Sequence, residues 1–263
     1  MDLHLENKIT IVTGGANGIG RSICEEFVKE GSKVIIGDID KNKADNLCFE
    51  INKKYKEKKA YSFTLDVTDI NQIKKMKDFV VEKFGQINNL VNCAGLITIN
   101  QVRNLTEEEW DKIFDVNIKG VFLCSKIIAN EMINNNIKGN IINISSKAGK
   151  TGQIYEAHYS ASKAAVNAFT QALSKEVAKE GINVNAVCPG SIENKLNKKI
   201  TKEKAKLEQI SWEKLWESSI NSIPLGRKGK PEEIAKLVVI LASNVSDYIT
   251  GQAINISGGA EVH

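Results

Sequence analysis

The sequence contains few of the residues that build metal centres, disulfide frameworks and membrane spans. Its 263 residues include only three histidines, and its five cysteines are odd in number and never form a CxxC pair. We therefore expect no metal site, and buried thiols in a reducing compartment rather than disulfides. The N-terminus has no apolar signal core, and the apolar run at 237–242 is far too short to cross a bilayer. These absences predict a cytoplasmic protein without a membrane span.

An excess of one charge is also missing. The formal net charge is only +4, and the lysines of 53–59 alternate with a glutamate. Such a run is typical of a solvated helix end, so we expect no nucleic-acid partner. The chain is 42% hydrophobic and 26% charged, as in globular proteins. Its length suits one α/β domain spanning 1–263.

Strand-like and helix-like patterns alternate along the chain. Strands are expected at 8–12, 33–36, 60–65, 89–92, 139–144, 182–187 and 253–256, and helices at 19–29, 41–58, 71–84, 107–136, 157–180 and 231–241. Repeated βα units with right-handed crossovers predict an α/β fold, a doubly wound parallel sheet with helices on both faces.

Residues 191–224, called here the lid segment, interrupt this alternation. The segment is polar and helical in pattern, with Trp212 and Trp216 four residues apart. It is either a surface excursion or a lid over the active site. Ligands of such folds lie outside the carboxyl ends of the strands, which favours the lid.

A glycine-rich loop follows the first predicted strand and opens the first helix. Residues 13–20 read TGGANGIG, where Gly14, Gly18 and Gly20 permit a tight turn and close approach to a pyrophosphate. Such loops are often only turns, but the strand–turn–helix context is the one that nucleotide binding requires. The ends of the third and fourth strands, at Asp66-Val67 and at 92–95, are expected to lie against the same nucleotide.

Asp38 ends the second strand, eighteen residues after Gly20. A carboxylate there accepts hydrogen bonds from ribose hydroxyls and repels a 2′-phosphate, which predicts NAD over NADP. The alternative is a turn or helix-capping aspartate, a role that suits Asp40 better. The nearby Lys41 and Lys43 weaken the preference for NAD.

A tyrosine and a lysine stand four residues apart in YSASK at 159–163. On a helix Tyr159 and Lys163 share one face, and the ammonium is expected to lower the pKa of the phenol. Ser146 at a strand end is placed to hold a substrate oxygen. The arrangement predicts general acid/base chemistry on an alcohol or carbonyl; the alternative is an ordinary amphipathic helix.

These motifs together resemble the short-chain dehydrogenase/reductase (SDR) family along nearly the whole chain. The resemblance rests on TGGANGIG at 13–20, DV at 66–67, NCAG at 92–95, DVNIKG at 115–120, ISS at 144–146, YSASK at 159–163, CPG at 188–190, LGRKGKPEEIA at 225–235 and YITGQAINISGG at 248–259. It implies a Rossmann-type fold, a nicotinamide cofactor and a homotetramer, in which the helices around Phe122 and Phe169 pair across an interface.

The resemblance also implies roles for individual residues. Tyr159 is the expected acid/base, Lys163 lowers its pKa and binds the nicotinamide ribose, Ser146 holds the substrate oxygen, and Asn117 supports a water that connects Lys163 to solvent. Tyr155 and Ser145 are rejected on spacing. The expected cofactor-binding residues are Gly14, Asn17, Gly18, Ile19, Gly20, Asp38, Asp66, Val67, Asn92, Ala94, Gly95, Tyr159, Lys163, Pro189, Gly190, Ile192 and Asn194.

Two positions depart from the family pattern. Cys93 stands where a second asparagine is common, and Asn194 stands where a threonine often binds the nicotinamide carboxamide. The asparagine side chain can still donate and accept, and the Ile192 backbone is the alternative contact.

The layout is similar to that of polyol and acetoin/diol dehydrogenases, so the expected substrate is a small sugar alcohol or vicinal diol converted to a ketose or hydroxyketone. The alternatives are a 3-oxoacyl-(acyl-carrier-protein) or general ketoreductase and, more remotely, a non-catalytic nucleotide-binding regulator. The candidate pocket residues are Lys150, Gln153, Glu156, His158 and Glu193.

Overall fold

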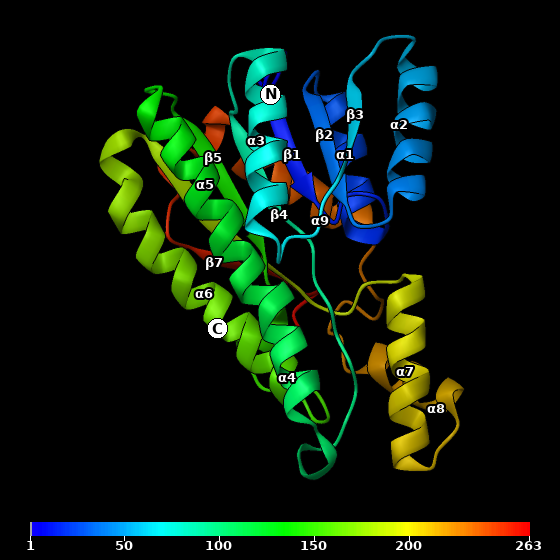
Figure 1. Cartoon of the computed structure of the whole chain (residues 1–263). Helices are drawn as coiled ribbons and strands as arrows, with labels where there is room; N and C mark the ends of the chain where they lie inside the picture. The colour runs from blue at the N-terminus through cyan, green and yellow to red at the C-terminus, as the bar shows by residue number, and fades with distance from the viewer. Residues whose placement is uncertain (1) are drawn as a thin grey trace.

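The computed structural model describes residues 2–263. At its centre is a seven-stranded sheet in which every pair of neighbouring strands is parallel (Figure 1). The strands are β1 (Ile9–Thr13), β2 (Lys33–Asp38), β3 (Ala60–Thr64), β4 (Asn89–Asn92), β5 (Gly139–Ile144), β6 (Ile182–Pro189) and β7 (Ala253–Ile256). Their order is β3-β2-β1-β4-β5-β6-β7, which confirms the predicted doubly wound α/β fold.

Helices cover both faces of this sheet. One hydrophobic core lies beneath α1 (Gly18–Lys29), α2 (Lys41–Tyr55) and α9 (Pro231–Leu241). The other lies beneath α3 (Ile70–Phe84), α5 (Gly120–Asn134) and the end of α6 (Ala157–Val177). In Figure 1, α3, α5 and α6 stand in front of the sheet and α9 behind it. The strand order reverses between β1 and β4, which is where ligands of such sheets bind.

The helix predicted at 107–136 is not continuous. It comprises α4 (Glu107–Phe114), a π-helical turn η2 (Asp115–Lys119) and α5. Thr106 and Glu109 form a capping box at the start of α4. The π-turn matters because such turns are frequent at functional sites, and this one holds the fully buried Asn117.

Four short 3₁₀ turns complete the chain: η1 (Val102–Asn104), η3 (Lys147–Gly149), η4 (Ala178–Glu180) and η5 (Asn244–Ser246). The turn η3 directly follows Ser146 at the end of β5, and η4 continues α6. Within residues 2–263, no helix has both the length and the apolar character needed to cross a membrane.

The lid segment folds into two helices, α7 (Lys195–Glu208) and α8 (Trp212–Asn221). The helical pattern breaks at Gln209, whose backbone is left-handed with φ 55°, and Ser211 then caps α8 by accepting a hydrogen bond from the Lys214 amide. The two helices pack mainly on each other. Figure 1 shows them below the carboxyl edge of the sheet.

Candidate active site

The glycine-rich loop connects β1 to α1 in a conformation that fits a pyrophosphate. Gly14 has φ +63°, and a Cβ there would lie 2.6 Å from the Cα of Ala94, so the loop lies directly against the residues after β4. At Gly18, with φ +52°, no described heavy atom lies within 4 Å of the place a Cβ would take. The Asn17 side chain makes no cap hydrogen bond to the described residues. The first turn of α1 is thus open to an anion.

Asp38 is buried at the end of β2 and faces the glycine-rich loop. Its carboxylate accepts hydrogen bonds from the Ala16 amide at 3.0 Å and from the Asp40 amide at 3.0 Å. The side chain of Asp40 instead caps α2 by accepting from the Lys43 amide at 3.1 Å. The predicted helix-capping role of Asp40 is therefore confirmed. Asp38 is held beside the glycine-rich loop.

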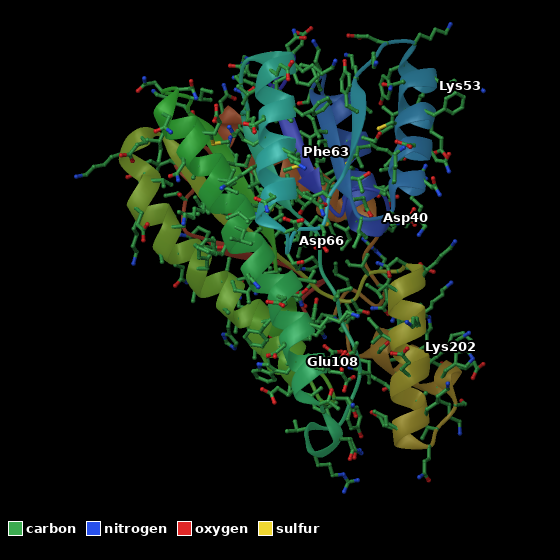
Figure 2. All side chains as sticks on the ribbon, in the orientation of Figure 1. Asp40, Lys53, Phe63, Asp66, Glu108 and Lys202 are labelled. Carbon is green, nitrogen blue, oxygen red and sulfur yellow. The ribbon has the colours of Figure 1, made fainter. Side chains whose placement is uncertain are left out.

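Lys43 also forms an ion pair with Asp40, and Lys41 pairs with Asp45 at 2.6 Å. Both lysines are thus engaged by carboxylates on their own helix. In Figure 2, Asp40 and Asp66 are both labelled at the carboxyl edge of the sheet, where the glycine-rich loop also lies.

The residues after β3 and β4 complete this edge. Asp66 stabilises a turn, because its carboxylate accepts from the amide and the hydroxyl of Thr68 at 2.9 and 2.7 Å. The Val67 side chain packs directly on Gly120. A Cβ added to this glycine would lie only 2.7 Å from the Val67 side chain. The amides of Cys93 and Ala94 both donate to the Thr13 hydroxyl at 3.2 Å, which joins the β4 end to the glycine-rich loop.

Asn92 lies beneath these residues in a buried polar chain. Its amide donates to Ser125 at 3.0 Å and to Asn143 at 2.8 Å. Its carbonyl oxygen has no hydrogen-bond partner among the described residues. The structure therefore places Asn92 as a support of the β4 end rather than as an exposed contact.

Tyr159 lies in the first turn of α6, within hydrogen-bonding reach of Ser146, which follows β5 and precedes η3. The Ser146 hydroxyl also accepts from the Ala148 amide at 3.1 Å, which fixes its position. Of the two rejected neighbours, Ser145 is engaged through its hydroxyl and Tyr155 through its backbone. The Ser145 hydroxyl donates to the Lys163 carbonyl at 3.0 Å, and the Tyr155 carbonyl accepts from the Asn100 amide at 3.0 Å.

Lys163 and Asn117 lie close to this pair. The Lys163 ammonium is 5.8 Å from the centre of the Tyr159 ring and donates to the Ile144 carbonyl at 2.8 Å. Asn117 exchanges two hydrogen bonds with the backbone of Leu96, at 2.7 and 2.8 Å. A Cβ on Gly95 would lie 3.4 Å from Asn117 Oδ1 and 3.6 Å from Lys163 Nζ. All four predicted catalytic residues are thus brought together.

The sequence did not indicate that Ser162 forms a further hydrogen bond with Asn117. Its amide also donates to the Ser162 hydroxyl at 3.1 Å, and Ser162 in turn donates to the Tyr159 carbonyl at 2.8 Å. The π-turn and α6 are therefore joined directly behind the proposed acid/base. Ser162 is the second serine of YSASK, and the spacing alone gives it no distinct signal.

Burial, rather than Lys163, has the largest effect on the pKa of Tyr159 in this structure. Burial raises the pKa of the Tyr159 phenol above its usual value, and the nearby Ser146 hydroxyl opposes this only in part. Burial also lowers the pKa of Lys163 to about 8. The physical reason is that desolvation penalises both charged forms, while the ammonium is directed to the Ile144 carbonyl.

The loop after β6 connects the site to the lid segment. Gly190 packs closely on Ser257, and its amide donates to the Ile256 carbonyl at 3.0 Å. Ile192 is buried and forms an isolated bridge with Gly229. Asn194 caps α7, because its carbonyl oxygen accepts from the Asn197 amide at 2.8 Å. That contact leaves only the amide group of Asn194 for the predicted carboxamide contact.

Lys228, which the sequence did not single out, anchors the lid segment. Its ammonium lies 3.4 Å from the centre of the Trp216 ring and donates to Asn197 Oδ1 at 2.8 Å. Burial lowers its pKa to about 8. Trp216 and Trp212 meet edge to face at 6.4 Å. The tryptophans thus pack within the segment and onto Lys228.

Three of the five candidate pocket residues are already engaged. Glu156 forms an ion pair with Lys204 at 2.6 Å, and His158 is fully buried with Nε2 2.6 Å from the Thr98 hydroxyl. Gln153 donates to the Thr151 carbonyl at 2.7 Å. The remaining two are Lys150, which lies in the turn after Ser146, and Glu193, whose amide donates to the Gly229 carbonyl at 2.8 Å.

Comparison with known proteins places this arrangement in a family. The model for the short chain dehydrogenase family matches residues 8–205. The chain therefore belongs to the short-chain dehydrogenases/reductases, oxidoreductases that use a nicotinamide cofactor.

Particular relatives differ in the reactions that their names describe. The chain is 40% identical over 257 residues to the 3-oxoacyl-(acyl-carrier-protein) reductase FabG of Thermotoga maritima, a match that covers 98% of this chain and 99% of the relative. It is 38% identical to the galactitol 2-dehydrogenase of Agrobacterium fabrum, with 98% of each chain covered. The sorbitol-6-phosphate 2-dehydrogenase SrlD of Erwinia amylovora is similar in structure, with a TM-score of 0.93, 30% identity and coverage of 97% and 100%.

Proposed function

We propose that this enzyme transfers a hydride between NAD(H) and a secondary alcohol or ketone, with a sugar alcohol or vicinal diol as the substrate class. One observation carries the proposal. Ser146, Tyr159 and Lys163 meet at the carboxyl edge of the sheet, beside the open first turn of α1 and the buried Asp38.

Each residue has a separate task in the proposed reaction. When bound, the nicotinamide supplies or accepts the hydride. Tyr159 donates its phenolic proton to the oxygen of a ketone, and in the other direction its phenolate removes the proton of an alcohol. Ser146 donates a hydrogen bond to the same oxygen. General acid/base catalysis of this kind contributes about 10² to 10⁴ in rate.

The cofactor is held by the residues around this edge. Gly14 and Gly18 let the pyrophosphate approach the first turn of α1, and Asp38 accepts from the ribose hydroxyls. Lys163, beside the Tyr159 ring, would bind the nicotinamide ribose. Because the carboxylate of Asp38 is buried and faces the loop, it disfavours the extra phosphate of NADP. The proposed cofactor is therefore NAD.

The substrate class rests on the lid segment and on the relatives. A two-helix lid with polar groups at its base suits a small hydroxylated substrate, and both the galactitol and the sorbitol-6-phosphate dehydrogenases act on sugar alcohols, as their names state. The identity of 40% with an acyl-carrier-protein reductase favours a second candidate, reduction of a 3-oxoacyl thioester.

A substrate screen separates these candidates. Purified enzyme is assayed with a panel of polyols, acetoin and an acetoacetyl thioester, each with NAD(H) and NADP(H). We expect turnover of polyols or acetoin with NAD(H). Activity on the thioester alone would replace the proposal with the second candidate. NADH binding without turnover of any compound would indicate a nucleotide-binding regulator instead.

We also propose a homotetramer in the cytoplasm. Phe122 of α5 is 41% exposed and meets Phe169 of α6 edge to face at 6.2 Å, so these two helices present an aromatic surface for a second copy. All five cysteines are free thiols, in keeping with a reducing compartment. Light scattering coupled to size exclusion should give four times the mass of one chain, and Phe122→Glu should reduce it.

A further inference from the structure

One ion pair joins the lid segment to the helix that carries the proposed acid/base. Lys204 lies in the third turn of α7, and Glu156 is the residue immediately before α6, three positions before Tyr159. Their Nζ and Oε1 atoms are 2.6 Å apart, with 18% and 9% of the respective side chains exposed. Most other ion pairs of the described chain are surface pairs. This one is largely excluded from solvent, so its two charges depend on each other.

No second cation compensates the Glu156 carboxylate within the described residues. Lys204 is the basic group within 4 Å of it. His158, two residues further on, lies in the field of both Glu156 and Glu109 of α4. Burial lowers the pKa of His158, so its imidazole is neutral near neutral pH. If α7 moves away, the Glu156 carboxylate loses its ion-pair partner among the described residues.

The proposed acid/base lies within the field of this carboxylate. The titratable groups that face the Tyr159 phenol are Glu156, Cys93 and Cys188, with Lys163 beneath the ring. Burial raises the pKa of both thiols, that of Cys93 to about 12, so neither carries charge near neutral pH. Glu156 is therefore the anion whose state affects the phenol, and it disfavours the phenolate.

We propose that the Lys204–Glu156 ion pair is a latch that couples the position of the lid segment to the charge around Tyr159. With α7 in place, Lys204 neutralises Glu156 and the phenol can lose its proton more readily. With α7 displaced, the unpaired carboxylate holds the phenol protonated. Lys204 and Glu156 are positioning residues in this inference, which rests on the proposed role of Tyr159.

The pH profile of alcohol oxidation tests the coupling. Lys204→Met leaves the carboxylate unpaired, so the midpoint of kcat should move to higher pH, by about half a unit to one unit. Glu156→Gln removes the anion and should move the midpoint to lower pH or leave it unchanged. The double variant should lie close to Glu156→Gln. Lys206 is an exposed lysine on the same helix. Lys206→Met is therefore the matched control and should not shift the profile.

The position of the lid segment can be measured without turnover. Two of the three tryptophans, Trp212 and Trp216, lie on α8, so tryptophan fluorescence and limited proteolysis report on this segment. Lys204→Met and Glu156→Gln should both accelerate cleavage within 195–221, by several-fold over wild type and Lys206→Met. If no substrate is found at all, this measurement still tests the latch.

Two outcomes would overturn the inference. One is loss of activity in Lys204→Met with an unchanged pH midpoint, which indicates a purely structural ion pair. The other is cleavage of the lid segment at the wild-type rate in both single variants, which shows that the ion pair does not hold α7. Folding of each variant is checked by far-UV circular dichroism, and Glu156→Gln, which leaves no unpaired buried carboxylate, is the variant expected to fold best.

Discussion

The nucleotide edge of the sheet and the lid segment are held in place by different forces. At the nucleotide edge, side chains are fixed by strand ends, by backbone amides and by the direct contact of Gly14 with Ala94. The lid segment packs mainly on itself and is tied to the rest by charged side chains, Lys228 at its base and Lys204 at its side.

This difference assigns the chemical step to the nucleotide edge and the access of substrate to the lid segment. A rigid edge keeps the acid/base and the cofactor residues in one geometry, which is what hydride transfer requires. A segment held by a few side-chain contacts can open and close at a small free-energy cost. Substitutions at the edge should therefore change kcat or cofactor choice, and substitutions in the lid segment other than at Lys204 should change mainly KM.

The largest expected effect is at Tyr159. Tyr159→Phe removes the only group proposed to exchange the proton, so kcat should fall by about 10² to 10⁴ while NADH still binds. Turnover is measured with the best polyol, and NADH affinity by fluorescence titration. Tyr155→Phe is the control and should retain wild-type kcat. Substantial turnover in Tyr159→Phe would mean that another group is the acid.

The next effect is on cofactor choice. Asp38→Ser removes a charged acceptor of ribose hydrogen bonds, so kcat/KM for NAD should fall about 10- to 100-fold, and the ratio of NAD to NADP efficiency should fall with it. Asp40→Ser removes the cap of α2 and the ion-pair partner of Lys43 but leaves Asp38 in place, so it should change that ratio far less. A wild-type preference for NADP would contradict the assignment of Asp38.

The pH dependence of the two directions should differ. Burial raises the pKa of Tyr159, so the phenol form dominates near neutral pH and the phenolate fraction rises about tenfold per pH unit below the pKa. Oxidation uses the phenolate, and its kcat/KM should rise between about pH 7 and about pH 9. Reduction uses the phenol and should not rise. Initial rates in both directions test this, and a flat oxidation profile would disagree with a raised pKa.

The smallest effect is expected at the base of the lid segment. Lys228→Met removes a cation from the Trp216 face, an interaction worth about 0.5–2 kcal/mol. We expect KM for the substrate to rise several-fold, with kcat and NADH affinity nearly unchanged. Lys236 is an exposed lysine on α9, so Lys236→Met is the control and should keep the wild-type KM. A fall in kcat with unchanged KM would place Lys228 in the chemistry instead of the lid.

The sequence predicted the sheet and the members of the site because these depend on local signals. The glycine spacing at 13–20, the strand ends and YSASK each specify a backbone context, and the strands at 89–92, 139–144 and 253–256 have the predicted bounds. The π-turn at Asp115–Lys119 was missed because DVNIKG has an ordinary helical pattern. The break between α7 and α8 was missed although Ser211 is a recognisable cap.

The contacts of the lid segment were beyond prediction for another reason. Lys204 and Glu156 are far apart in sequence, and Lys228 lies beyond the lid segment whose Trp216 it contacts. Lysine side chains are long and flexible, so their partners depend on the tertiary arrangement. The raised pKa of Tyr159 could not be predicted for a similar reason, because spacing on a helix places the ammonium near the ring but gives neither the burial of the phenol nor the Ile144 carbonyl that accepts from Lys163.

The π-turn makes chain length as important as residue type between α4 and α5. A π-helical turn contains one residue more than the matching stretch of α-helix, so deleting one residue from Asp115–Lys119 would restore a regular helix and rotate the preceding segment by about 100°. Asn117 would then swing away from Leu96 while both helices stayed intact. Deletions and insertions should consequently be tolerated at 209–211, between α7 and α8, far better than here.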